Sequence, residues 1–64
     1  MSVAKHIEIT AESPDSFEAA VRDGIKKASD SIKGIRSAWI KDQQVVVSGD
    51  NVTLYRVNMK VTFV

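Results

Sequence analysis

The last thirteen residues of the chain, 52–64, alternate between apolar and polar side chains. This alternation is typical of a β-strand with one buried face. At the usual rise the strand would be roughly 43 Å long. The only helix candidate has about 18 residues and would span roughly 27 Å. Since the strand is longer than the helix that covers it, we expect the remainder to be buried against further copies of the chain. The apolar positions are Tyr55, Val57, Met59, Val61 and Phe63, and the polar positions are Arg56, Asn58, Lys60 and Thr62.

Three further elements precede this strand. Residues 3–10 alternate in the same way and predict a first strand. A helix is predicted to follow, with Ser13 as its N-cap, Pro14 at its first position and Gly34 as a left-handed stop. Residues 35–47 predict a second strand, which a turn at 48–51 joins to the last one. The helix has an apolar stripe formed by Phe17, Ala20, Val21, Gly24, Ile25, Ala28 and Ile32.

This order predicts an α+β fold, a single βαββ domain over residues 1–64. The second and third strands form a hairpin, and the helical crossover makes the first strand parallel to the second. The simplest sheet therefore has the third strand in the middle, in a three-stranded, antiparallel-type sheet wrapped on one helix.

The alternation of apolar and polar residues changes parity within the second predicted strand. Ala38 and Ile40 point to one face, whereas Val45 and Val47 have the opposite parity. A β-bulge near residues 43–44 would return both pairs to the core face, so we expect one there.

The composition argues against several classes of function. The chain has no cysteine, and its nine Lys/Arg and eight Asp/Glu leave a net charge of +1, which does not predict a nucleic-acid partner. His6 is the single histidine, and we expect no metal site and no catalytic role for it. Since no phosphate loop or nucleophile elbow is present, we expect no enzyme. Without a signal peptide or apolar span, we expect a cytoplasmic protein with no membrane partner.

Trp39 is the exception among the polar residues of the sheet. It shares the face opposite the helix with Ser37. A two-residue turn would place Trp39 opposite Lys60, and Gln43 opposite Arg56. Two interpretations remain open for Trp39. It packs in a subunit interface beside cationic side chains, which we favour, or it offers a platform on which a flat ligand stacks.

The order of residues resembles the dodecin family across essentially the whole chain. The similarity lies in the first strand, KHIEIT, in the start of the helix, SPDSFEAA, and in the closing strand, YRVNMKVTF. The resemblance implies a βαββ protomer that assembles into a hollow dodecamer. It also implies, for many members, that flavins are bound in pairs and stored without catalysis.

The departures from the family fall on the flavin site. The flavin-stacking tryptophan of the family corresponds to Ser37, and its flavin-contacting glutamine corresponds to Arg56. Trp39 would replace the lost ring only if the ligand moved by roughly 7 Å along the strand. Arg56 offers a planar fork for phosphate or carboxylate, or a salt bridge across an interface. The candidate ligand-binding residues are therefore Ser37, Trp39, Arg56 and Lys60.

We accordingly expect a non-catalytic homo-dodecamer that binds or stores an anionic small molecule or ions, with a degenerate flavin site and no resident cofactor. One alternative is a genuine flavin-storage protein that holds FMN or riboflavin with Trp39 and Arg56. Another is a purely structural cage without an organic ligand. An enzyme is the weakest hypothesis, because no residues meet the roles of nucleophile, base and oxyanion donor.

Overall fold

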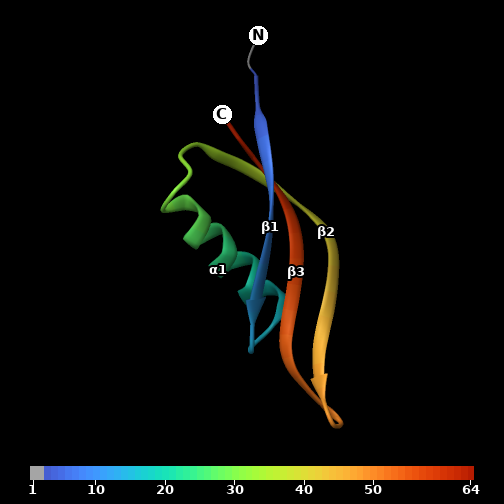
Figure 1. Cartoon of the computed structure of the whole chain (residues 1–64). Coiled ribbons are helices and arrows are strands. Elements are labelled where there is room, and N and C mark those ends of the chain that lie inside the picture. Colours follow the sequence, from blue (N-terminus) through green and yellow to red (C-terminus); the bar gives the residue numbers. More distant parts are fainter. Residues whose placement is uncertain (1–2) are drawn as a thin grey trace.

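The computed structural model describes residues 3–64 and has one helix and three strands (Figure 1). The sheet order is β1-β3-β2, and both outer strands are antiparallel to β3. This confirms the predicted α+β class, the βαββ order and the central third strand. The elements are β1 at Lys5–Ser13, α1 at Phe17–Ser29, β2 at Ile35–Ser48 and β3 at Asn51–Phe63.

The core lies between α1 and β3, where the predicted alternation of the last strand is confirmed. Val57, Met59 and Val61 of β3 and Ala20 of α1 are fully buried. Each large apolar side chain buried in this way stabilises the fold by about 1.5–3 kcal/mol. The partly buried side chains that pack around them are Ile7, Ile9, Ala11, Phe17, Val21, Ile25, Ile35, Ala38 and Ile40.

The helix is shorter than predicted, and a different serine caps it. Ser16 is the N-cap, and its hydroxyl accepts a hydrogen bond from the backbone N–H of Ala19 at 2.9 Å. Ser13 is instead the last residue of β1, where it is buried and pairs with Tyr55. Its hydroxyl accepts from the backbone N–H of Asp15 at 3.0 Å and so shapes the turn before the helix. The prediction was wrong because pairing with β3 holds Ser13 in the sheet, which also extends β1 beyond the predicted end at residue 10.

The chain leaves the helix earlier than predicted as well. Asp30 is the C-cap, in a right-handed helical conformation, and Ile32 lies beyond the helix. Gly34 does have a positive φ of 77°. However, it is not the helix stop, because it turns the chain into β2. Its carbonyl accepts a hydrogen bond from the N–H of Val64 at 3.1 Å, which ties this turn to the end of β3.

The predicted bulge in β2 exists, but two residues earlier. The register against β3 shifts between Ile40 and Asp42, so Lys41 is the extra residue. The shift places Val45 opposite Tyr55, on the side of the sheet that carries the core. Lys41 has charged and aromatic neighbours on the polar side of the sheet, which favours the extra residue there rather than among the glutamines.

A second register shift lies between Val46 and Val47, and here the extra residue, Thr53, belongs to β3. Since one extra residue lies in each strand, the two shifts in register cancel. Trp39 is consequently opposite Lys60, as predicted. Between the two bulges the pairing is displaced by one residue, so Gln44 lies opposite Arg56 and the prediction of Gln43 was wrong. A third shift separates Ile35 from Ser37.

The sheet is longer than the helix that covers it, as the strand length predicted. Figure 1 shows the β2–β3 hairpin continuing well beyond the first turn of α1. The principal extents of the molecule are 51 × 20 × 14 Å. Within residues 3–64, no helix has the length and apolar character needed to cross a membrane.

Candidate ligand-binding face and interface

We call the side of the sheet opposite α1 the outer face. Alternate residues of each strand point to this side. The strand pairing arranges them in rows across β1, β3 and β2. From one end of the sheet to the other, the rows are His6, Thr62 and Ser37; Glu8, Lys60 and Trp39; Thr10, Asn58 and Asp42; and Glu12, Arg56 and Gln44.

Trp39 lies between two lysines on this face, and we call these three residues the Trp39 cluster. The Nζ atoms of Lys41 and Lys60 are each 5.8 Å from the centroid of the indole ring, within the range of a cation–π contact. The bulge carries Lys41 to this position, where its Nζ also lies 3.5 Å from a carboxylate oxygen of Glu8. Trp39 nevertheless remains 65% exposed. Within a single protomer, the cluster is therefore an exposed aromatic surface beside two positive charges.

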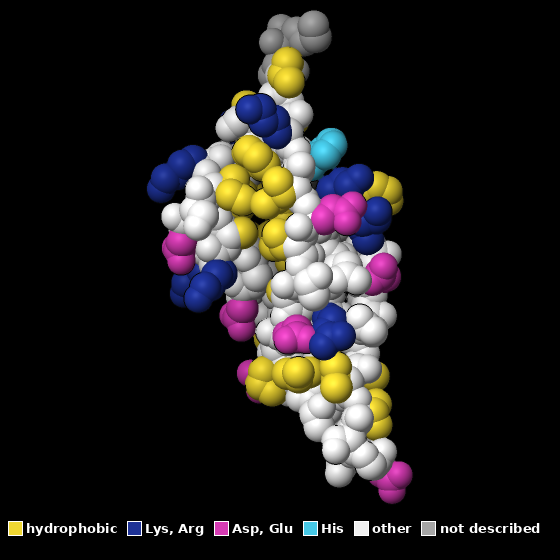
Figure 2. Space-filling view, in the orientation of Figure 1, with side chains coloured by type: hydrophobic (Ala, Val, Ile, Leu, Met, Phe, Trp, Pro, Cys, Tyr) yellow, Lys and Arg dark blue, Asp and Glu magenta, His cyan; other side chains and the backbone are white. Residues whose placement is uncertain are grey.

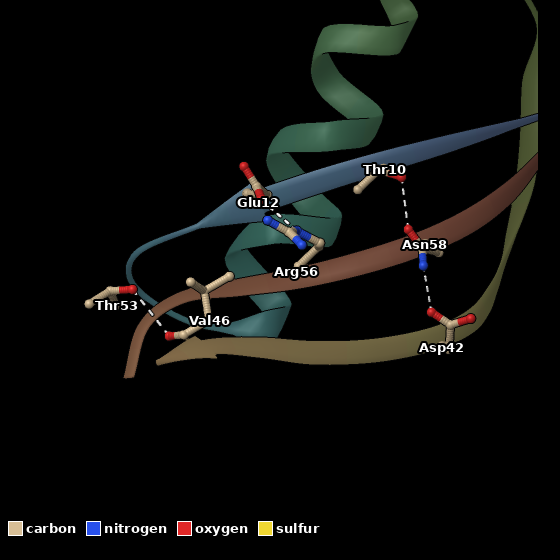
Figure 3. Close-up of polar contacts among 7 residues, drawn as sticks. All are labelled: Thr10, Glu12, Asp42, Val46, Thr53, Arg56 and Asn58. Atoms are coloured by element: carbon tan, nitrogen blue, oxygen red, sulfur yellow. Dashed lines mark hydrogen bonds and ion pairs between the residues drawn. The ribbon is translucent and has the colours of Figure 1, made fainter. Parts of the chain in front are cut away.

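Arg56 is separated from this cluster. It lies four residues before Lys60 on β3, a distance of about 13 Å along the strand. Its Nε donates to Oε2 of Glu12 at 2.5 Å, in an ion pair within one protomer (Figure 3). The structure thus brings together three of the four predicted ligand-binding residues, Ser37, Trp39 and Lys60, but not the arginine.

A hydrogen-bonded chain crosses all three strands between the two groups. The hydroxyl of Thr10 donates to Oδ1 of Asn58 at 2.8 Å, and Nδ2 of Asn58 donates to Oδ1 of Asp42 at 2.6 Å (Figure 3). Sequence reasoning missed this chain. The sequence did show an amide side chain, Asn58, among the polar positions of the central strand. Its pairing with Asp42, however, depends on the position of the bulge in β2.

Two hollows lie near these residues. One of about 160 Å³ on the outer face is lined by Glu8, Thr10, Lys41, Asp42 and others. A larger one of about 470 Å³ lies between β1 and α1 and shares no residue with the Trp39 cluster. Within residues 3–64, no three His, Asp or Glu side chains come together in a group that would hold a metal ion. A single protomer thus offers no preformed metal site in this part of the chain.

The far end of the hairpin presents apolar side chains to solvent. Val45, Val47 and Val52 are 40%, 56% and 46% exposed. Val45 and Val47 are two residues apart in β2, so they share the core side of the sheet, but they lie past the end of α1. Figure 2, which views the sheet from the side opposite α1, shows that apolar side chains also gather on that side at the lower part of the molecule. This is the uncovered part of the sheet that the strand length predicted.

Comparison with known proteins extends over nearly the whole chain. The sequence profile of the family described as Dodecin matches residues 3–64. Calcium dodecin from Mycobacterium tuberculosis is 36% identical over 63 residues, which cover 98% of this chain and 89% of that protein. The crystal structure of that calcium dodecin matches with a TM-score of 0.85 and 35% identity, over 97% and 89% of the two chains. The structure of dodecin from Streptomyces coelicolor gives a TM-score of 0.92 at 21% identity, over 95% and 87%.

Proposed function

The chain belongs to the dodecin family, and on this premise we propose that it assembles into a homo-dodecamer that holds a small anionic ligand or ions and catalyses no reaction. The observation that carries the proposal is the apolar hairpin surface beyond α1, with Val47 more than half exposed. The chain has only 64 residues, so its own core is small, and burial of this surface against other copies stabilises the fold.

The outer face supports a binding role without the flavin site of the family. Ser37 stands where the family has its stacking tryptophan, and a hydroxyl provides no ring surface for a flavin. The alternative site, built from Trp39 and Arg56, would have to span more than one row of the sheet. Arg56 is in addition engaged by Glu12. Both features favour a degenerate flavin site over a rebuilt one.

Calcium is a second candidate, favoured by the relative named calcium dodecin, which is 36% identical to this chain. The smaller hollow of the outer face is lined by oxygen-bearing side chains, including Glu8, Thr10 and Asp42, and Ca²⁺ takes six to eight oxygen ligands. One protomer brings too few carboxylates together within residues 3–64. A calcium site would therefore draw oxygens from more than one copy, and its loss would accompany dissociation.

Light scattering coupled to size exclusion, with absorbance recorded to 500 nm, tests the assembly. A colourless species of about twelve protomers supports the proposal. A yellow flavin band on that species would favour FMN or riboflavin storage instead. A monomer would overturn the assembly, because the exposed valines would then have no partner.

Calorimetric titration of the assembled species separates the ligand classes. After treatment with a chelator, the protein is titrated with FMN, with riboflavin, with Ca²⁺ and with inorganic phosphate. If a heat of binding is measured for Ca²⁺ and for neither flavin, the calcium candidate is supported. Micromolar binding of riboflavin contradicts a degenerate flavin site. If FMN, riboflavin, Ca²⁺ and inorganic phosphate all fail to bind, the structural cage is the remaining function.

A further inference from the structure

We propose that the hydrogen bond between Asn58 and Asp42 locks the register of the β2–β3 hairpin, and that this register turns three valines toward the side of the sheet that assembly buries. The inference rests on the proposed assembly and names the residue pair that orients its contact surface. The three residues, which we call the valine face, are Val45, Val47 and Val52.

The two bulges enclose a block of the hairpin whose pairing is displaced by one residue. Residues 42–46 of β2 pair with residues 54–58 of β3. A hairpin without bulges would pair residues 41–46 with residues 53–58, and the pairs at either end of the block would stay the same. Since β2 is an outer strand, a change of its register involves only its ladder with β3 among the described strands. The same hairpin ends are therefore compatible with two registers.

The two registers place different side chains opposite Asn58. Oδ1 of Asn58 accepts from the hydroxyl of Thr10 at 2.8 Å, so its Nδ2 donors point toward β2 (Figure 3). In the observed register Asp42 lies opposite, and its Oδ1 accepts from Nδ2 at 2.6 Å. Without the bulges Lys41 would lie there, and an ammonium group has donors only. The hydrogen-bonded chain across the sheet is therefore complete only in the observed register.

The other outer-face positions of the block do not distinguish the two registers. Arg56 lies opposite a glutamine in both, and Leu54 lies opposite a valine in both. Each bulge leaves one residue out of the ladder and interrupts its hydrogen bonds, so the observed register needs a compensating interaction. A hydrogen bond to a carboxylate is stronger than one between neutral groups. The pair at Asn58 is therefore the outer-face contact that favours the bulged register.

The register decides on which side of the sheet the valine face lies. Val45 is opposite Tyr55 on the core side, and Val47 and Val52, which are opposite each other, share that side. Neighbouring residues of a strand point to opposite faces, so an extra residue reverses the facing of all residues beyond it. Without the two bulges the three valines would point to the outer face, and Gln44 would lie opposite Tyr55.

Engineered cysteine pairs report the register, because the chain has no cysteine of its own. Opposite residues of an antiparallel pair have Cα atoms about 4.5–5.5 Å apart, a separation that a disulfide spans. Gln44→Cys with Arg56→Cys reports the observed register, and Gln43→Cys with Arg56→Cys reports the bulge-free one. We expect the first pair to form its disulfide at least about tenfold faster, because a hydrogen bond to a charged group shifts an equilibrium by about that factor or more.

Exchange of the two residues at the bulge in β2 is the decisive variant. Lys41→Asp combined with Asp42→Lys retains the composition and the net charge, but it places the carboxylate opposite Asn58 in the bulge-free register. We expect the preference between the two cysteine pairs to reverse. Since the valine face then turns to the outer side, we also expect smaller species by light scattering. Asp42→Asn is the matched control, because its amide oxygen still accepts from Asn58, and it should retain both the register and the size.

An exchange variant that still forms its disulfide through residue 44 overturns the register lock. If the exchange variant does not fold, Asp42→Val removes the acceptor alone, and we expect it to lower the preference by about tenfold. An unchanged preference in Asp42→Val, with the circular dichroism of the wild type, also overturns the lock.

Light scattering on the same samples distinguishes these failures from failure of the proposed assembly. A change of register without a change of mass contradicts the role of the valine face in assembly. A monomeric wild-type protein that prefers the first cysteine pair supports the lock and contradicts only the assembly.

Discussion

The ring of Phe17 packs edge-on against the ring of Tyr55, with centroids 5.1 Å apart and planes inclined by 76°. Phe17 is the first residue of α1, and Tyr55 lies on β3 where the buried run of the strand begins. This contact closes one end of the core. Beyond it, nothing within residues 3–64 covers the apolar side chains of the hairpin, and Val45, Val47 and Val52 are exposed.

Replacement of Phe17 by alanine tests how much this closure stabilises the fold. We expect Phe17→Ala to lower the free energy of unfolding by about 3 kcal/mol, because apolar burial and the edge-on contact are both lost. Urea denaturation at one fixed protomer concentration measures the effect, since assembly adds to apparent stability. Phe17→Leu serves as the control, and its free energy of unfolding should fall by less than half as much as that of Phe17→Ala. An unchanged midpoint in Phe17→Ala would show that the ring pair contributes nothing.

Gly24 is required by the close approach of α1 to the sheet. A Cβ at this position would lie 2.7 Å from the Cβ of Ala11 and 3.0 Å from the terminal methyl of Met59. Gly24→Ala therefore lowers stability by about 1–3 kcal/mol, although alanine favours the helix by about 1 kcal/mol. The double variant Gly24→Ala/Ala11→Gly removes the nearest clash and should recover part of the loss. Thermal unfolding of the three proteins would contradict this account if Gly24→Ala alone were the most stable.

The exposed valines of the hairpin are expected to hold the assembly together. Val47→Lys places a charge on this surface, and its burial against another copy would be costly, so we expect smaller species by light scattering. Asp50→Lys adds the same side chain at the exposed hairpin turn and should leave the size unchanged. If Val47→Lys retains the wild-type mass, the hairpin surface is not a subunit contact.

Asn58 links β1 to β2 through its amide. Asn58→Ala removes both hydrogen bonds and leaves the hydroxyl of Thr10 and the carboxylate of Asp42 without this partner. We expect a loss of about 1–2 kcal/mol, because the bonds are partly solvated. Thr10→Val removes one bond only and should cost about half as much. Urea midpoints for the two variants check the ratio, and an equal loss in both would mean that the bond to Asp42 contributes nothing.

Much of the fold followed from periodicity. The alternation of β3 predicted its buried face, and the apolar stripe of α1 predicted the side of the helix that meets the sheet. Both patterns are local consequences of backbone geometry, so they can be recognised in a single sequence. The expectation of an uncovered sheet end needed only the lengths of two elements.

The candidate site was predictable only in part. The sequence placed Trp39 opposite Lys60, which is correct because the bulge in β2 and the bulge in β3 cancel. It placed Gln43 opposite Arg56, which is wrong because only one of those bulges lies between that pair and the turn. A single extra residue thus decides which side chains meet.

The sequence by itself determined the order of the elements, the faces of α1 and β3 and the excess length of the sheet, since each depends on residues close together in the chain. The tertiary structure decided that Ser16 caps the helix rather than Ser13, that Lys41 joins Trp39, and that Glu12 engages Arg56. These outcomes depend on pairing between strands far apart in sequence. Strand pairing is a cooperative property of the whole sheet, and local preference does not specify it.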